Sequence, residues 1–169
     1  MRATSTFTRS TSSGPNSIGV QTSPGRLVQT LAQASLTVGE SSMSGVGGNK
    51  ETTVSYYDKG PIVGFLLDAR IRRLTDDRKS LDDVMRLAYK RYGGTRGFTP
   101  EQFQATASEI AGADLQPFFH SALDTTEELD YRESLDWFGL QLTDAWALGV
   151  RPDASDVQAR HLERLAGVR

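Results

Sequence analysis

Ser55-Tyr56-Tyr57-Asp58-Lys59-Gly60 leads directly into Pro61 and a long run of apolar residues at helical spacing. Proline suits the first position of a helix because its φ is already helical and its missing N–H has no partner there. We therefore predict a helix from Pro61 to about Leu74. Apolar side chains cover much of its circumference, which predicts a central place in the fold. These side chains are Ile62, Val63, Phe65, Leu66, Leu67, Ala69, Ile71 and Leu74.

The tyrosine pair is predicted to lie in the turn that precedes this helix. Turns between elements carry binding and catalytic residues more often than the elements themselves. We therefore expect Tyr57 to project from the helix entrance toward a neighbouring surface. On spacing alone, the plainer interpretation is that Tyr56 and Tyr57 pack with their hydroxyls at the rim.

The remaining pattern predicts an all-α fold, a compact bundle of about five to six short helices. Ser80 with Asp83, and Thr99-Pro100-Glu101-Gln102, are start signals of the capping-box type. Glycines follow the apolar stripes and predict the helix ends. A short strand is expected near 140, and a solvated terminal helix over 157–165. The predicted helices span about 24–36, 61–74, 80–92, 100–111, 115–123 and 131–138. The fifth is expected to be capped by Asp114, and the apolar stripe of the first consists of Leu27, Val28, Leu31, Ala32 and Leu36.

Three segments are expected along the chain. Residues 1–24 are rich in Ser, Thr, Gly and Pro and precede the first acidic residue, Glu40, which is typical of a disordered tail. An organellar transit peptide shares this composition and is the alternative. Residues 25–142 form the helical domain, with a flexible glycine-rich loop at 39–50. Residues 143–169 are expected to be a tail or the remnant of a linker.

Composition excludes several classes of protein. The 169 residues carry a net charge of −2 and no cysteine, with a mean hydropathy of −0.41 and a pI near 5.7. Nucleic-acid binding needs clustered positive charge, so a nucleic-acid partner is not expected. No apolar run is long enough to span a membrane, and no secretory signal is present, so we expect a soluble protein of undetermined compartment.

Few residues carry recognisable chemistry. His120 and His161 are not part of an H-E-x-x-H sequence and have no spacing typical of zinc ligands. We therefore predict that His120 is a helix-surface or partly buried residue and that His161 is a plain surface residue. No G-x-S-x-G or phosphate-binding glycine loop occurs. The arginines at 70, 72, 73 and 78 are interpreted as a solvated helix end, with a phosphate or carboxylate site as the alternative. No metal ligands are predicted.

Several ordered motifs between about residues 18 and 142 resemble the glycyl aminopeptidase family of zinc metallopeptidases. The separations between these motifs also agree with the family. The matching stretches are Pro24-Gly25-Arg26-Leu27-Val28-Gln29-Thr30-Leu31-Ala32-Gln33-Ala34-Ser35, Ser55-Tyr56-Tyr57-Asp58-Lys59-Gly60, Ser80-Leu81-Asp82-Asp83-Val84-Met85, Gly97-Phe98-Thr99-Pro100-Glu101 and Thr126-Glu127-Glu128-Leu129-Asp130-Tyr131.

This resemblance implies a role for the tyrosine motif. In the family, and in the wider gluzincin aminopeptidases, zinc lies between a thermolysin-like subdomain and a helical subdomain. The tyrosine of Tyr-x-Lys-Gly stabilises the tetrahedral intermediate there, a role that falls on Tyr57. Lys59 and Gly60 would set the turn, and Tyr56 and Lys59 would lie near the substrate. The expected substrates are peptides with small N-terminal residues, and many relatives carry a PDZ domain after the helical part.

The chain also departs from the family. Its H-E-x-x-H and third, glutamate ligand would lie upstream of the matched region, and residues 1–17 cannot supply them. Residues 144–150 faintly resemble the beginning of a PDZ domain, but too few residues follow. We therefore expect a helical fragment of a zinc aminopeptidase, inactive alone, whose partners are the thermolysin-like half and a peptide. The zinc belongs to the full-length family and not to this chain.

The alternative is a stand-alone helical module that binds a protein partner without catalysis. Under either hypothesis, the surface that would face the metal-binding half is expected to be unusually apolar for a monomer. Self-association through this face is therefore possible. The two hypotheses differ in whether a segment that carries H-E-x-x-H restores hydrolysis.

Overall fold

The computed structural model describes residues 24–36, 53–143 and 147–167. This part of the chain is mostly helical with one two-stranded antiparallel sheet, which confirms the predicted all-α bundle with a short strand near 140. The elements are the 3-10 helix η1 (Pro24–Leu27), α2 (Leu31–Leu36), α4 (Tyr56–Leu74), α5 (Leu81–Tyr92), α6 (Pro100–Ala111), α7 (Gln116–Phe119), the π-helix η3 (His120–Asp124), α8 (Arg132–Trp137), β1 (Leu140–Leu142), β2 (Leu148–Val150) and α9 (Asp156–Leu165).

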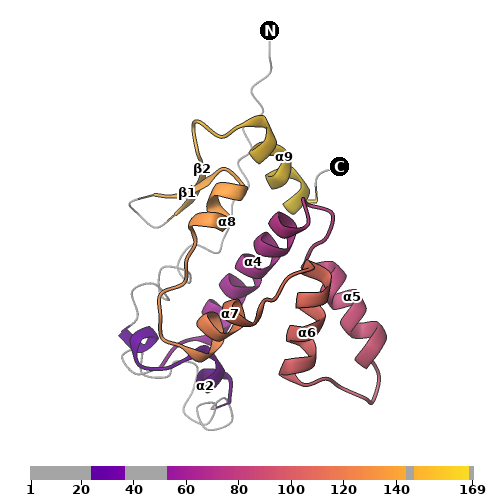
Figure 1. Cartoon of the computed structure of the whole chain (residues 1–169). Helices are drawn as coiled ribbons and strands as arrows, with labels where there is room; N and C mark the ends of the chain where they lie inside the picture. The colour runs from indigo at the N-terminus through magenta and orange to yellow at the C-terminus, as the bar shows by residue number, and fades with distance from the viewer. Residues whose placement is uncertain (1–23, 37–52, 144–146, 168–169) are drawn as a thin grey trace.

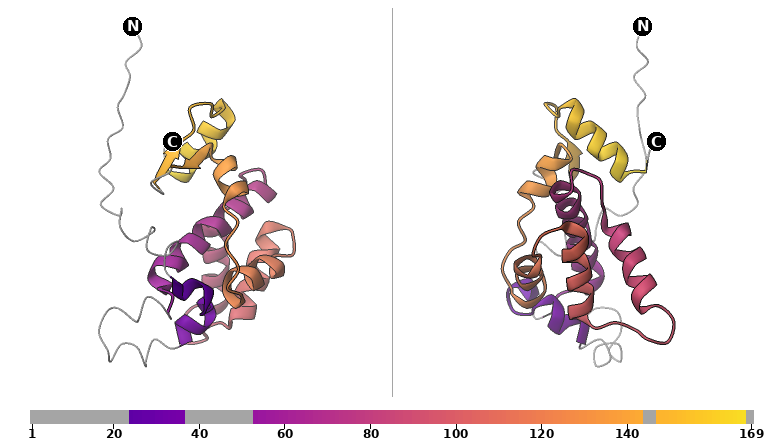
Figure 2. Two further views of the ribbon diagram at one scale, coloured as in Figure 1. Left: turned by 90° about the vertical axis from the view of Figure 1, so that its left-hand side faces the viewer. Right: turned by 45° about the vertical axis from the view of Figure 1, so that its right-hand side comes forward.

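Helix α4 is the central element, as its apolar pattern predicts. It contacts α2, α5, α6 and α8, and Figure 1 shows it running through the middle of the bundle with the α5–α6 pair along one side. Figure 2 shows α2 near one end of the bundle and the sheet with α9 at the other.

Three hydrophobic clusters surround α4. The first joins its C-terminal half to α5, α6 and α7 around Ile71, which is fully buried. The second joins its N-terminal half to α2 and η3 around Leu66. The third packs Ala69 against Phe138 and the β1 residue Leu140. Because all three clusters include residues of α4, this helix couples the packing of the whole bundle.

Helix α4 begins at Tyr56, so the prediction that it starts at Pro61 was wrong. The Ser55 hydroxyl caps the helix by accepting a hydrogen bond from the Asp58 amide at 3.3 Å. Pro61 lies inside the second turn, where its fixed φ is still helical and only one backbone donor is lost. The tyrosines therefore occupy the first turn of the helix and not a preceding turn.

Other helix boundaries follow the predicted caps. Ser80 with Asp83 and Thr99 with Gln102 form capping boxes at the starts of α5 and α6. Gly112 ends α6 with φ of 65°, a left-handed conformation that glycine adopts without strain. These signals are local, so the sequence reports them directly.

The first predicted helix is interrupted. Residues 28–30 separate η1 from α2, and α2 restarts where Gln33 and Thr30 exchange hydrogen bonds between their side chains and backbone amides. Only Leu31 and Ala34 of α2 are buried. The predicted apolar stripe was therefore wrong for its remaining large members, since Leu27, Val28 and Leu36 are 60%, 64% and 84% exposed.

The fifth predicted helix is also modified. It divides into α7 and the π-helix η3, and its N-cap is Leu115, where Asp114 was expected. The Asp114 carboxylate still accepts a hydrogen bond from the Gln116 amide at 2.9 Å. η3 contacts α2, and its buried Ala122 belongs to the second cluster with Leu31 of α2 and Leu66 of α4.

The C-terminal region packs on the bundle. The helical domain was expected to end at residue 142, but β1 before this boundary pairs with β2 after it, and Leu140 lies opposite Val150. Helix α9 adds Leu162 and Leu165 to the third cluster. His161, predicted to be a plain surface residue, is half-buried and stacks on Trp137 with ring centroids 3.8 Å apart. The solvated terminal helix expected over 157–165 is therefore present as α9 (Asp156–Leu165), whereas β2 was not expected in a segment predicted to be a tail.

Some predictions fall elsewhere. The expected tail, apart from Pro24, and the expected loop at 39–50 lie outside the described residues, as do positions 144–146 of the PDZ-like stretch. Among the helices that the structure describes, none combines the length and the apolar character needed to cross a lipid bilayer.

Candidate functional site

The candidate site is the first turn of α4. The Tyr56 and Tyr57 rings are 4.3 Å apart at their centroids and tilted by 37°. Tyr56 packs against the second hydrophobic cluster, whereas Tyr57 is 76% exposed. The predicted packing of both rings therefore holds for Tyr56 only. Tyr57 presents its ring and hydroxyl to whatever binds at this end of the bundle.

The two hydroxyls are electrostatically linked. Hydrogen bonding to the Tyr57 side chain is the main cause that raises the pKa of Tyr56, with desolvation adding to it. The raised pKa keeps the Tyr56 phenol protonated at neutral pH. Tyr57 carries its hydroxyl on the exposed side of the pair.

Lys59 does more than set a turn. Its side chain is buried, with only 4% of the residue exposed, and burial lowers the pKa of its ammonium, an effect that Glu128 partly opposes. Lys59 forms no ion pair with another residue in the described ranges, whereas Arg26 binds Glu128 at 3.2 Å. A lysine in this position is expensive to keep charged, which is more typical of functional sites than of cores.

The space beside Lys59 is too small for a substrate. It has a volume of about 10 Å³ and lies between the start of α4 and residues 126–131. This volume accommodates roughly one water molecule. Any peptide bound here must therefore lie against the exposed face of Tyr57, with Lys59 behind it.

The predicted solvated helix end holds for only part of the arginine group. Arg70 and Arg78 are exposed, whereas Arg72 is half-buried between Asp68 and Asp77, at 2.8 Å from each carboxylate. Desolvation lowers the pKa of Arg72, but the hydrogen bonds that it donates to both carboxylates, with their charges, raise it by more. Arg164 of α9 adds a second contact to Asp77 at 2.9 Å. This network closes the C-terminal end of α4 and is structural.

The described residues do not fit a zinc site. His120 contacts only Asp124 on its own turn, at 3.6 Å, and is exposed. No group of three or more His, Cys, Asp or Glu side chains within 24–36, 53–143 and 147–167 is arranged to hold a metal ion. We therefore assign no metal ligand in this part of the chain.

No family model, curated protein or solved structure matches the chain. The resemblance to glycyl aminopeptidases accordingly rests on the ordered motifs in the sequence, and it remains a basis for a proposal.

Sequence reasoning missed the burial of Lys59 and a cavity beside Arg70 that is described below. Both are formed by segments far apart in the chain, so no spacing signals them. The only local sign of the cavity in the sequence is that the apolar residues 117–119 are followed, a few positions later, by the charged stretch 126–133.

Proposed function

We propose that the chain is the helical part of a zinc-dependent aminopeptidase that cleaves small residues from peptide N-termini. In this proposal the zinc is held by a separate thermolysin-like segment with H-E-x-x-H, and Tyr57 stabilises the oxyanion of the tetrahedral intermediate. The observation that carries it is the exposure of Tyr57, which is 76% exposed at the start of the central helix.

The surroundings of Tyr57 support a preorganised donor. The Ser55 cap fixes the first turn of α4, and the adjacent Tyr56 ring restricts the orientation of Tyr57. Because Tyr57 is 76% exposed, its O–H is accessible to a carbonyl oxygen bound at this end of the bundle. A preorganised donor of this kind changes kcat by about 10² to 10³ fold in acyl-transfer enzymes.

Lys59 supports the same turn from behind. Its buried stem packs between α4 and residues 126–131, the segment that also carries the Arg26–Glu128 ion pair. This packing positions Tyr57 without placing Lys59 in contact with a bound peptide. We therefore assign Lys59 a positioning role.

The test is reconstitution with a thermolysin-like half taken from a glycyl aminopeptidase. The chain alone is expected to bind no stoichiometric zinc and to leave glycyl and alanyl anilides intact. The mixture is expected to hydrolyse both anilides, and hydrolysis should disappear when zinc is chelated. A complex that forms and binds zinc but shows no turnover would contradict the proposal.

The exposure of Leu27, Val28 and Leu36 favours a second candidate, a protein-interaction module without catalysis. These side chains are unusually exposed for their type and lie on η1, α2 and the segment between them. A polar variant, Leu36→Ser, should weaken self-association or partner binding measured by sedimentation. Restored hydrolysis in the mixture above would decide for the enzyme.

A further inference from the structure

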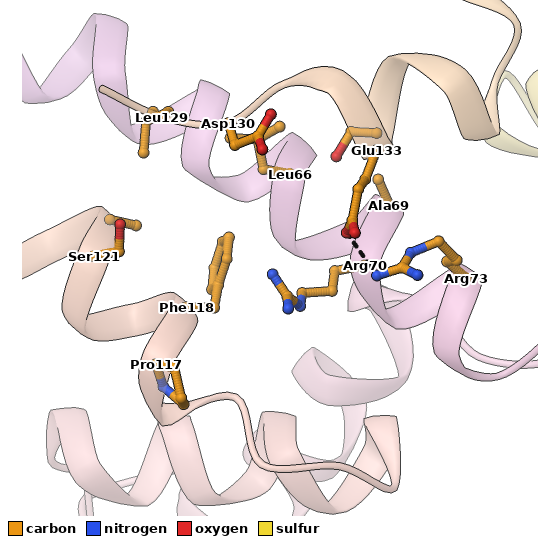
Figure 3. A pocket seen from close by; sticks show the side chains of 12 residues that line it. Leu66, Ala69, Arg70, Arg73, Pro117, Phe118, Ser121, Leu129, Asp130 and Glu133 are labelled. Carbon is orange, nitrogen blue, oxygen red and sulfur yellow. Dashed lines mark hydrogen bonds and ion pairs between the residues drawn. The ribbon is translucent and has the colours of Figure 1, made fainter. Parts of the chain in front are cut away.

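A second hollow lies along α4, away from the tyrosines. It has a volume of about 350 Å³ and is enclosed by the C-terminal half of α4, the α7–η3 bend and residues 129–134 (Figure 3). Arg70 lies thirteen residues beyond Tyr57 on the same helix, which corresponds to about 20 Å along its axis. The cavity is therefore distinct from the candidate site and does not depend on the proposed function.

The lining has one uncompensated positive charge. Its two carboxylates are paired, Glu133 with Arg73 at 2.6 Å and Asp130 with Arg132 at 3.2 Å. Arg70 has no ion pair with any residue in the described ranges. Its guanidinium carbon lies 5.8 Å from the centroid of the Phe118 ring, and Figure 3 shows the two side chains next to each other. An anion there meets one available guanidinium and no unpaired carboxylate.

Two hydroxyls also line the cavity without a partner. Ser121 and Ser134 both border it, and Ser134 is only 7% exposed. Neither side-chain hydroxyl forms a hydrogen bond with another residue that the structure describes. Ser121 is half-buried and Arg70 is exposed, so the two hydroxyls and the guanidinium are donors that a ligand in the cavity can reach.

The rest of the lining is apolar. Leu66, Ala69, Phe118, Ala122 and Leu129 supply this surface. Together with Pro117 they make up half of the lining, and the other half is polar or charged. Small-molecule sites have volumes that begin at about 300 Å³. The cavity is at the small end of that range, which favours a compact ligand.

We propose that this cavity binds a small monocarboxylate that has an aromatic or branched apolar body. Arg70 binds the carboxylate through its planar fork of N–H donors. The Ser121 and Ser134 hydroxyls are additional donors to the same group, and the apolar body packs against Leu66 and Leu129. One unpaired cation balances a monoanion and leaves a phosphate ester with excess negative charge.

The test is calorimetric titration of the full chain with 3-phenylpropanoate at 0.1 M salt. We expect saturable binding with a Kd below about 1 mM, which is ordinary for a ligand of this size. The neutral isostere 3-phenylpropanamide should bind at least about tenfold more weakly, because it lacks the charge that Arg70 recognises. Absence of saturable binding by the acid, or equal binding of acid and amide, would overturn the proposal.

Variants locate the binding in this cavity. Arg70→Gln should weaken it about tenfold or more and Ser134→Ala about threefold, whereas the exposed Arg86→Gln on α5 should leave it unchanged. Arg70 is itself exposed, so Arg70→Gln should keep the unfolding midpoint of the wild type. Unchanged binding by both Arg70→Gln and Ser134→Ala would place the ligand elsewhere and overturn the assignment.

A third titration distinguishes the two sources of such a carboxylate. Acetyl-glycyl-phenylalanine carries the same group as the C-terminal residue of a peptide. If this peptide binds and its C-terminal amide does not, a peptide C-terminus is an accepted form of the ligand. Binding of 3-phenylpropanoate without the peptide would restrict the site to free acids. Both results support a carboxylate site.

Discussion

The two ends of α4 treat buried charge differently. At the C-terminal end, Arg72 is held by Asp68 and Asp77, and the Asp77 carboxylate is only 1% exposed. At the N-terminal end, Lys59 is equally removed from solvent but has no ion pair among the described residues, and Tyr57 beside it is open. The first arrangement stabilises the fold. The second retains groups that contribute little or are unfavourable to it, as expected where a surface is kept for function.

The packed end can be broken by removing its most buried side chain. Ile71 is fully buried in the first cluster, so Ile71→Ala should lower the free energy of unfolding by about 3 to 4 kcal/mol through lost burial and a cavity. Denaturant unfolding followed by circular dichroism measures this. Leu74→Ala, three residues along at a position 41% exposed, is the control and should cost about 1 kcal/mol or less.

The charge network at the same end is tested by Asp77→Asn. Asparagine has the same shape as aspartate and tolerates the left-handed φ of 58° at this position. The change therefore leaves the backbone intact and leaves Arg72 with one carboxylate. We expect a loss of about 2 kcal/mol, because a buried charge loses a partner. The control is Asp82→Asn, because Asp82 pairs with Arg86 on the surface and its side chain is 77% exposed. This change should lower the free energy of unfolding by less than about 0.5 kcal/mol. Equal costs would remove the contrast between buried and surface pairs.

The unpaired lysine predicts a pH dependence at the other end. Burial lowers the pKa of Lys59 below its ordinary value of 10.5. Between the lowered pKa and 10.5, the unfolded chain binds a proton that the folded chain lacks, so the free energy of unfolding rises with pH. Below the lowered pKa, the cost of burying the charge is fully present.

Lys59→Met should therefore remove this alkaline rise and leave the protein equally stable at pH 7, or more stable by up to about 1 kcal/mol. Urea unfolding at pH 7, 9 and 10.5 measures both effects. The exposed Lys90→Met is the control and should keep the pH dependence of the wild type. A loss of stability at pH 7 in Lys59→Met would show that the ammonium has a favourable partner.

The smallest effect on folding is expected at Tyr57. Because its side chain is exposed, Tyr57→Phe should change the free energy of unfolding by less than about 0.5 kcal/mol. The same denaturant experiment checks this. A large loss of stability would mean that Tyr57 is a packing residue, which is the plainer interpretation given in the sequence analysis.

Local chemistry made much of the fold predictable. The boxes at Ser80 and Thr99 and the glycine at 112 act within a few residues, so the sequence contains the whole signal. Pro61 misled because the Ser55 cap lies six residues before it and both residues are valid helix-start signals. The stripe on 24–36 failed because helical spacing does not show that the backbones of Gly25 and Thr53 approach closely, which leaves no room for a side chain at position 25.

The candidate site was predictable only in part. Tyr57 could be chosen from its motif, and its exposure follows from its place on the first helical turn. The burial of Lys59 depends on residues 126–131, and the unpaired state of Arg70 depends on which carboxylates its neighbours take. Both are properties of packing between distant segments, and no spacing in the sequence reports them.

The most direct test of the central claim is kcat of the reconstituted complex with Tyr57→Phe. The account predicts a decrease of about 10² to 10³ fold with zinc content and complex formation unchanged, because only the hydroxyl donor is lost. Tyr89→Phe, at a position 79% exposed on α5, should keep the wild-type kcat. A Tyr57→Phe complex whose kcat lies within about threefold of wild type would contradict the assignment of Tyr57 as the oxyanion donor.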